Sequence, residues 1–181
     1  MAVTSTPVSP GRNTFYLAYL GLALSIVILD QLSKLWIIQN IELHRAIPVM
    51  KMFSIVHARN YGAAFGFLND AGGWQTVFFA LVSTGVSLVL LVWLKRASRI
   101  ERQLSIALSL VLGGAIGNLI DRLMYNYVVD FLLFYYERWQ FPAFNVADVA
   151  ISIGAFLLIL DSFGWKIVSD RSNGETQERS S

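Results

Sequence analysis

Four long apolar segments constrain this chain more than any other feature of its sequence. An α-helix needs about 20 mostly apolar residues to cross the ~30 Å hydrocarbon core of a bilayer. The four segments lie at about 15–38, 74–94, 104–120 and 146–165. With 181 residues, 55% hydrophobic and 14% charged, the chain is too short and too apolar for a soluble multidomain protein. We expect four transmembrane helices in one membrane domain, 15–168, with disordered tails at 1–14 and 169–181.

Basic residues predict how these segments cross the membrane, because Lys and Arg accumulate in short cytoplasmic loops. The hairpin 95–102 carries four basic residues, and Arg12 and Lys166 lie on the same side of the predicted bundle. Both termini should therefore be cytoplasmic, with the long connections 39–73 and 121–145 outside. We expect the first segment to be retained, since its apolar stretch is too long for a signal peptide and no small-residue cleavage site follows it.

The two outer connections have compositions that predict structure at the membrane surface. Residues 47–68 mix β-forming residues with a cluster of Gly and Ala at 60–66, which indicates short strands or a small sheet lying on the membrane. The stretch 128–144 contains seven aromatic residues and is expected to lie in the interface as an amphipathic segment. Both connections could cover a site at the outer surface.

Ionisable residues in hydrocarbon cost at least ~2.5 kcal/mol each at mid-depth, so they are usually paired or functional. Asp30 and Lys34 are four residues apart with the acid first, which favours an ion pair on one helix. Asp121, beside Arg122 at a helix end, is expected to hold the third segment against the outer loop. Asp161 lies near the cytoplasmic exit with a lysine after it, and snorkelling explains it.

Asp130 and Asp148 differ from these acids, because neither has a Lys or Arg within seven positions in the sequence. A helix N-terminal acid with Asn145 as N-cap would explain Asp148 but not Asp130. Two carboxylates in a poorly solvated site tend to share one proton, so that one activates water while the other donates to a carbonyl oxygen. Residue chemistry alone leaves two alternatives open, this hydrolytic pair and an ion-transport site.

Other potential sites carry less information. The chain has no cysteine, and its two histidines, His44 and His57, lack metal-ligand spacing and are interpreted as loop or interface residues. The net charge of +2 is small, and the basic residues do not form a nucleic-acid patch. The Gly113-to-Gly117 spacing predicts close helix packing. We therefore expect no metal, no cofactor and no nucleic-acid partner.

Five motifs, in this order, resemble the prolipoprotein signal peptidases of bacteria, also called signal peptidase II. The motifs occupy 30–34 (DQLSK), 60–65 (NYGAAF), 113–122 (GGAIGNLIDR), 129–131 (VDF) and 144–148 (FNVAD). The resemblance extends over about residues 15–165. It implies an all-α membrane protein with four transmembrane helices, a small extracytoplasmic β-sheet cradle and an interfacial amphipathic helix.

The resemblance also implies an aspartyl endopeptidase of the bacterial inner membrane, with its active site toward the periplasm. Such an enzyme removes the signal peptide from diacylglyceryl-modified prolipoproteins, cutting on the N-terminal side of the lipidated cysteine, so its partners are these substrates and membrane lipid. Asp130 and Asp148 would be the catalytic pair. The supporting or substrate-binding set would be Asp30, Lys34, Asn60, Gly114, Asn118, Asp121, Arg122 and Asn145. The alternative from a different class is a small ion or proton transporter that uses the intramembrane acids as a cation site.

Overall fold

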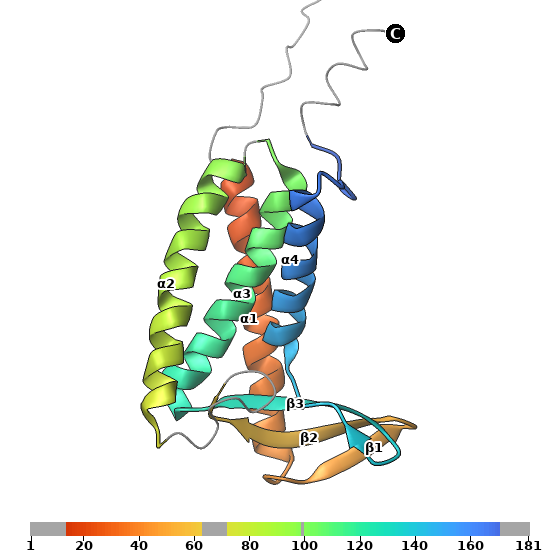
Figure 1. The fold of residues 1–181 in the computed structure, drawn as a ribbon. Coiled ribbons are helices and arrows are strands. Elements are labelled where there is room, and N and C mark those ends of the chain that lie inside the picture. Colours follow the sequence, from red (N-terminus) through yellow and green to blue (C-terminus); the bar gives the residue numbers. More distant parts are fainter. Residues whose placement is uncertain (1–13, 63–71, 99, 171–181) are drawn as a thin grey trace, which may run out of the picture.

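The computed structural model describes residues 14–62, 72–98 and 100–170. Its elements are α1 (Thr14–Asn40), β1 (Ala46–Met50), β2 (Phe53–Asn60), α2 (Trp74–Ala97), α3 (Arg102–Tyr125), β3 (Val128–Tyr136), β4 (Trp139–Gln140) and α4 (Val146–Ser162). The helices form one bundle, and the strands lie across one end of it (Figure 1). The described part of the chain is therefore mostly helical, with a small antiparallel sheet.

Three helices, α1, α2 and α3, are long and apolar enough to cross a membrane. The expected third segment, 104–120, extends to Tyr125 as α3, because its polar end finds hydrogen-bonding partners inside the protein. The shortest helix is α4, with 17 residues. It ends earlier than the expected residue 165, at a turn in which Gly164 has a φ of 75°.

Helix α3 packs against α1, α2 and α4, so it is the centre of the bundle. A Cβ atom added at Gly113 would lie 2.7 Å from the Ala23 carbonyl oxygen of α1. A Cβ atom at Gly117 would lie 2.6 Å from the Asp30 carboxylate. These close approaches confirm that the glycine spacing serves helix packing.

The sheet has the order β1-β2-β3-β4, and each neighbouring pair is antiparallel. Strand β2 pairs with β3 so that Ala58 lies opposite Asp130 and Asn60 opposite Val128. A hydrophobic cluster of Ile37, Ile41, Val129 and Phe131 joins the end of α1 to β3. The predicted strands within 47–68 are confirmed for the described residues; 63–68, including the end of the second motif, lie outside them.

The aromatic stretch 128–144, expected to lie in the interface as an amphipathic segment, is not helical. This stretch forms β3, a turn with Glu137 at a φ of 52°, and β4. Aromatic and β-branched residues suit a half-buried strand as well as an interfacial helix, and pairing with β2 satisfies the backbone of β3. No helix occurs in the described residues of the two outer connections after α1 and α3 end.

The two histidines have different environments. His44 lies in a turn, as expected, with a φ of 65°. The loop interpretation is wrong for His57, which lies on β2 and is buried. Its Nδ1 atom is 2.8 Å from the Ile41 carbonyl oxygen, so the ring ties β2 to the end of α1.

Candidate active site

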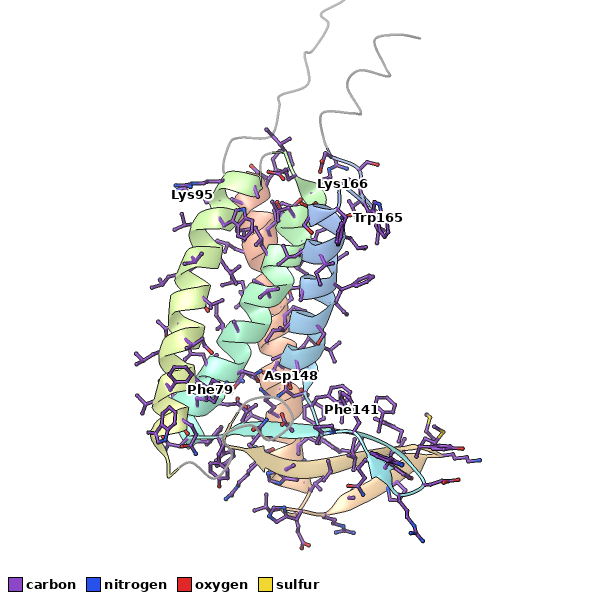
Figure 2. The ribbon with its side chains drawn as sticks, viewed as in Figure 1. Phe79, Lys95, Phe141, Asp148, Trp165 and Lys166 are labelled. Carbon is purple, nitrogen blue, oxygen red and sulfur yellow. The ribbon has the colours of Figure 1, made fainter. Side chains whose placement is uncertain are left out.

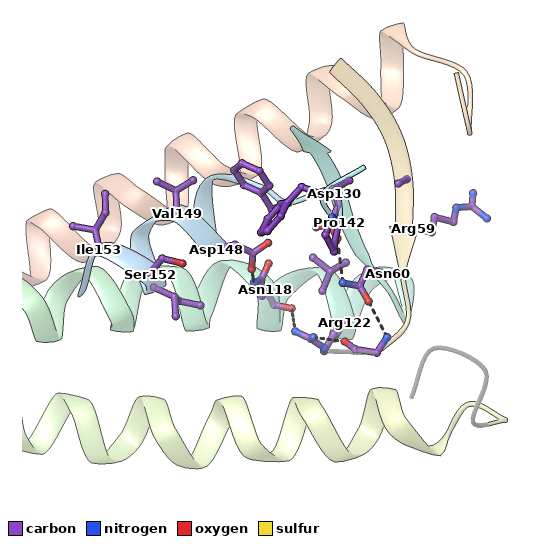
Figure 3. A pocket seen from close by; sticks show the side chains of 17 residues that line it. Arg59, Asn60, Asn118, Arg122, Asp130, Pro142, Asp148, Val149, Ser152 and Ile153 are labelled. Atoms are coloured by element: carbon purple, nitrogen blue, oxygen red, sulfur yellow. Dashed lines mark hydrogen bonds between the residues drawn. The ribbon is translucent and has the colours of Figure 1, made fainter. Parts of the chain in front are cut away.

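A cavity of about 700 Å³ lies where the helical bundle meets the sheet. Polar side chains from β2, α3, β3 and α4 line it (Figure 3). They include Asn60, Asn118, Arg122, Asp130 and Asp148. The two carboxylates that sequence analysis singled out as lacking a basic neighbour therefore open into the same cavity.

Asp130 lies near the start of β3 and is only 3% exposed. Its Oδ1 atom accepts a hydrogen bond from Asn145 Nδ2 at 2.7 Å, and its Oδ2 atom accepts one from Asn60 Nδ2 at 3.1 Å. Burial, reinforced by the negative charge of Asp148, raises the pKa of Asp130 to about 7. Asp130 can therefore hold or release a proton near neutral pH.

Asp148 lies in the first turn of α4, where Asn145 is the N-cap. The two residues form a reciprocal capping box: Asn145 Oδ1 accepts from the Asp148 backbone N–H at 2.9 Å, and Asp148 Oδ2 accepts from the Asn145 backbone N–H at 3.2 Å. The other carboxylate oxygen of Asp148 accepts a bond from Asn118 Nδ2 at 2.8 Å. Asp148 thus caps a helix, as one interpretation expected, and also faces the cavity.

Asn145 connects the two carboxylates, because it bonds directly to both. It is fully buried, and its Nδ2 atom lies within hydrogen-bonding distance of Asp130 Oδ1, of Asn118 Oδ1 at 3.2 Å and of the Val129 carbonyl oxygen at 3.3 Å. Asn145 thus holds the start of α4 against β3 and α3, which brings two acids that are 18 positions apart into one site.

A buried ionic cluster lies behind the cavity. Lys34, 2% exposed, places its Nζ atom 2.7 Å from Asp30 Oδ2 and 3.0 Å from Asp121 Oδ2. The same ammonium donates to Asn118 Oδ1 at 3.0 Å. The expected Asp30–Lys34 pair is confirmed, and it also holds the amide of Asn118 that contacts Asp148.

The two acids of this cluster fix neighbouring elements. Asp30 Oδ1 accepts from the Ala147 backbone N–H at 2.9 Å, which ties α1 to the first turn of α4. Asp121 Oδ2 accepts from the Val129 backbone N–H at 3.0 Å, which ties α3 to β3. The expected role of Asp121, holding the third helix against the outer loop, is confirmed.

Arg122 of α3 lines the cavity and contacts neighbouring elements. Its Nη1 atom donates to the Asn118 carbonyl oxygen at 3.2 Å, and its Nη2 atom donates to the Gly62 carbonyl oxygen at 3.1 Å. The guanidinium carbon lies 5.4 Å from the centre of the Phe79 ring of α2. Arg122 therefore links α2, α3 and the segment after β2, and it brings a positive charge close to both cavity acids.

Five of the ten expected site residues line the cavity, and the other five support it. The supporting residues are Asp30, Lys34, Gly114, Asp121 and Asn145. Gly114 acts by its small size, since a Cβ atom there would collide with the Ala147 carbonyl oxygen and with Ile151 of α4. Sequence reasoning missed Gln31, whose Nε2 atom donates to Asp121 Oδ1 at 2.8 Å. A polar amide within an apolar helix, next to Asp30, was the available signal.

The described residues contain no group of three or more His, Cys, Asp or Glu side chains placed to hold a metal ion. What the cavity does contain is two carboxylates, a guanidinium and amide side chains, all supported by hydrogen bonds from separate elements. This set can bind a peptide backbone and move protons.

Comparisons with known proteins agree with this geometry. A family model described as signal peptidase (SPase) II matches residues 22–164. The lipoprotein signal peptidase of Shewanella loihica is 52% identical over 83% of this chain and 86% of its own length. That of Shewanella piezotolerans is 54% identical over 76% of this chain and 81% of its own.

Solved structures show the same fold. A bacterial membrane enzyme superposes with a TM-score of 0.74 and 29% identity, covering 81% of this chain and 88% of that chain. A second bacterial membrane enzyme has a TM-score of 0.68 and 30% identity, covering 80% of this chain and 91% of that chain. These findings support the peptidase and not the cation transporter that sequence reasoning kept as an alternative. The chain, a membrane peptidase, belongs to the signal peptidase II family.

Proposed function

We propose that the chain is an aspartyl endopeptidase in which Asp130 and Asp148 activate a water molecule. The observation that carries this proposal is that the two carboxylates line one cavity and both accept hydrogen bonds from Asn145, Asp130 from its side chain and Asp148 from its backbone N–H. Burial and the negative charge of Asp148 both raise the pKa of Asp130, so Asp130 is the acid that holds a proton in this proposal. The reaction then needs water, the two carboxylates and the peptide bond.

The proposed reaction has two steps. In the first, the water oxygen attacks the peptide carbonyl carbon while Asp148 takes a water proton and protonated Asp130 donates to the carbonyl oxygen. In the second, the carbon–nitrogen bond breaks as Asp148 returns its proton to the leaving amine and Asp130 recovers the hydroxyl proton. A pKa of about 7 supports the acid role of Asp130, because a substantial fraction of this residue is protonated at neutral pH.

We propose prolipoproteins carrying a diacylglyceryl-modified cysteine as the substrates, with cleavage on the N-terminal side of that cysteine. The names of the Shewanella relatives support lipoprotein signal peptides as the target. The position of the cavity also supports it, because a lipid-anchored peptide must be cut where hydrocarbon meets water. The end of β2, at Asn60 to Gly62, could hold an extended peptide by backbone hydrogen bonds beside the two acids.

We further propose that α4 is a fourth transmembrane helix and that both termini are cytoplasmic, in the bacterial inner membrane. Its 17 residues are at the lower limit for a membrane span, and it packs along α3. Lys95 and Lys166 lie at the end of the bundle away from the sheet, where cytoplasmic basic residues are expected (Figure 2). The sheet and the cavity would then face the periplasm.

Purified protein in detergent tests the proposed chemistry directly. Wild-type protein should cut a synthetic diacylglyceryl prolipoprotein peptide, whereas Asp130→Asn and Asp148→Asn should each abolish cleavage. Asp161→Asn is the matched control, because Asp161 pairs with Lys166 at the other end of α4. Thermal unfolding of each variant shows that it is folded. Substantial cleavage by both Asp130→Asn and Asp148→Asn would refute the assignment.

A further inference from the structure

The cavity continues along α4 beyond the two acids. Val149, Ser152 and Ile153 line it together with Asp148 (Figure 3). From Asp148 to Ile153 an α-helix rises about 7.5 Å. The cavity therefore reaches more than one helical turn from the sheet toward the middle of the bundle.

The two parts of the cavity have different chemistry. Beside the sheet the wall carries the carboxylates, amides and guanidinium already described. Along α4 the wall is apolar except for one hydroxyl, that of Ser152. Val149 is 37% exposed and Ile153 is 48% exposed, so this part is open to the outside of the helical bundle.

Ser152 is exposed in this apolar part, one helical turn after Asp148. Its hydroxyl has no hydrogen-bonding partner among the described residues, whereas Ser25 and Ser162 each bond to a backbone carbonyl of their own helix. A hydroxyl in hydrocarbon without an internal partner gains a bond by donating to an acceptor on a ligand.

We propose that this part of the cavity, the α4 groove of Val149, Ser152 and Ile153, binds the diacylglyceryl group of the substrate, with Ser152 donating to one of its ester carbonyls. The inference rests on the proposed function and names how that substrate is held. The groove is continuous with the cavity of Asp148, so a lipid attached beside the cut bond reaches it directly.

A lipid fits the groove better than the signal peptide does. An extended peptide backbone presents N–H donors and carbonyl acceptors, and in hydrocarbon both must be satisfied. The groove offers one hydroxyl and otherwise hydrocarbon. An acyl ester requires only a donor, and its chain can lie against Val149 and Ile153 while the open side remains in contact with the bilayer.

Two lipid-modified substrates with the same peptide sequence test the role of Ser152. One carries ester-linked acyl chains; the other carries ether-linked alkyl chains, which lack the ester carbonyls. Wild-type protein in detergent should have a higher kcat/KM for the ester substrate. The ester-to-ether ratio should fall about threefold to tenfold in Ser152→Ala, the range that one net hydrogen bond supplies. An unchanged ratio in Ser152→Ala would overturn the proposal.

A second pair of variants tests the groove itself. Ile153→Trp should fill it and raise KM for the ester substrate with little change in kcat. Ile159→Trp is the matched control, because Ile159 lies on the same helix and is 55% exposed but does not line the cavity. Equal KM values for the two variants would exclude lipid binding in the groove. Failure of wild-type protein to cut either substrate would instead overturn the proposed function.

Discussion

The side-chain amide of Asn145 donates to the Asp130 carboxylate at 2.7 Å. The carbonyl oxygen of the same side chain accepts from the backbone of Asp148. One buried side chain thus sets the distance between a strand acid and a helix acid, which makes it a positioning residue for the proposed reaction.

The substitution Asn145→Asp should separate positioning from helix capping. Asp is as good an N-cap as Asn, so α4 should still form. The new carboxylate cannot donate to Asp130 and adds a negative charge, so the pKa of Asp130 should rise further and the alkaline limb of kcat/KM should move to higher pH. We expect kcat to fall on the order of 100-fold through misplacement of the pair.

The control for this variant is Asn126→Asp, at the exposed C-cap of α3. It makes the same chemical change at a residue that does not line the cavity, and its kcat and pH profile should match those of wild-type protein. Wild-type kcat and an unshifted alkaline limb in Asn145→Asp would contradict the positioning role.

The raised pKa of Asp130 predicts how stability depends on pH. In the folded protein this pKa is about 7, against 3.8 for an ordinary Asp, so between these values the folded state binds more protons than the unfolded state. The proton on Asp130 therefore stabilises the folded state fully below pH 3.8. This stabilisation is lost as the pH rises from 3.8 through 7, by up to roughly 1.4 kcal/mol per pH unit.

The variant Asp130→Asn removes this titration without changing the shape of the side chain. Its unfolding temperature should exceed that of wild-type protein by a margin that grows from about pH 4 to about pH 7 and then levels off. Thermal unfolding of both proteins in the same detergent measures the margin. A constant margin across this range would mean that Asp130 does not titrate there.

The sequence predicts much of this architecture because bilayer thickness limits helix length. It also identifies Asp130 and Asp148, because an acid without a neighbouring base is costly in an apolar chain. The strand assignment of β3 could not be predicted, since aromatic residues suit both a strand and an interfacial helix until β2 is known to lie beside them. The link through Asn145 depends on tertiary contacts between distant segments.

Lys34 should be far more important for stability than an ordinary lysine. Its ammonium lies between two buried acids, so Lys34→Met leaves Asp30 and Asp121 unpaired, at a cost of about 3–5 kcal/mol. The matched control is Lys166→Met. The Lys166 side chain is 32% exposed and pairs with acids near the bundle end, so its loss should cost only about 0–1 kcal/mol.

Denaturant or thermal unfolding in detergent distinguishes these two lysine variants. Adding Asp121→Asn to Lys34→Met should recover part of the lost stability, because one unpaired charge is removed. If Lys34→Met were as mild as Lys166→Met, the buried cluster would not hold the bundle together.

Gly114 should be intolerant of a single added methyl group. A Cβ atom there meets the Ala147 carbonyl oxygen and Ile151, and Ala147 is itself tied to Asp30, so α4 cannot move aside without moving Asp148. Gly114→Ala should cost about 1–3 kcal/mol in stability and also lower kcat.

Gly85→Ala is the matched control, since nothing lies within 4 Å of its added Cβ on α2. Alanine should there be neutral or stabilising by up to ~1 kcal/mol. Equal unfolding temperatures and equal kcat for the two variants would show that α3 and α4 do not need this close approach.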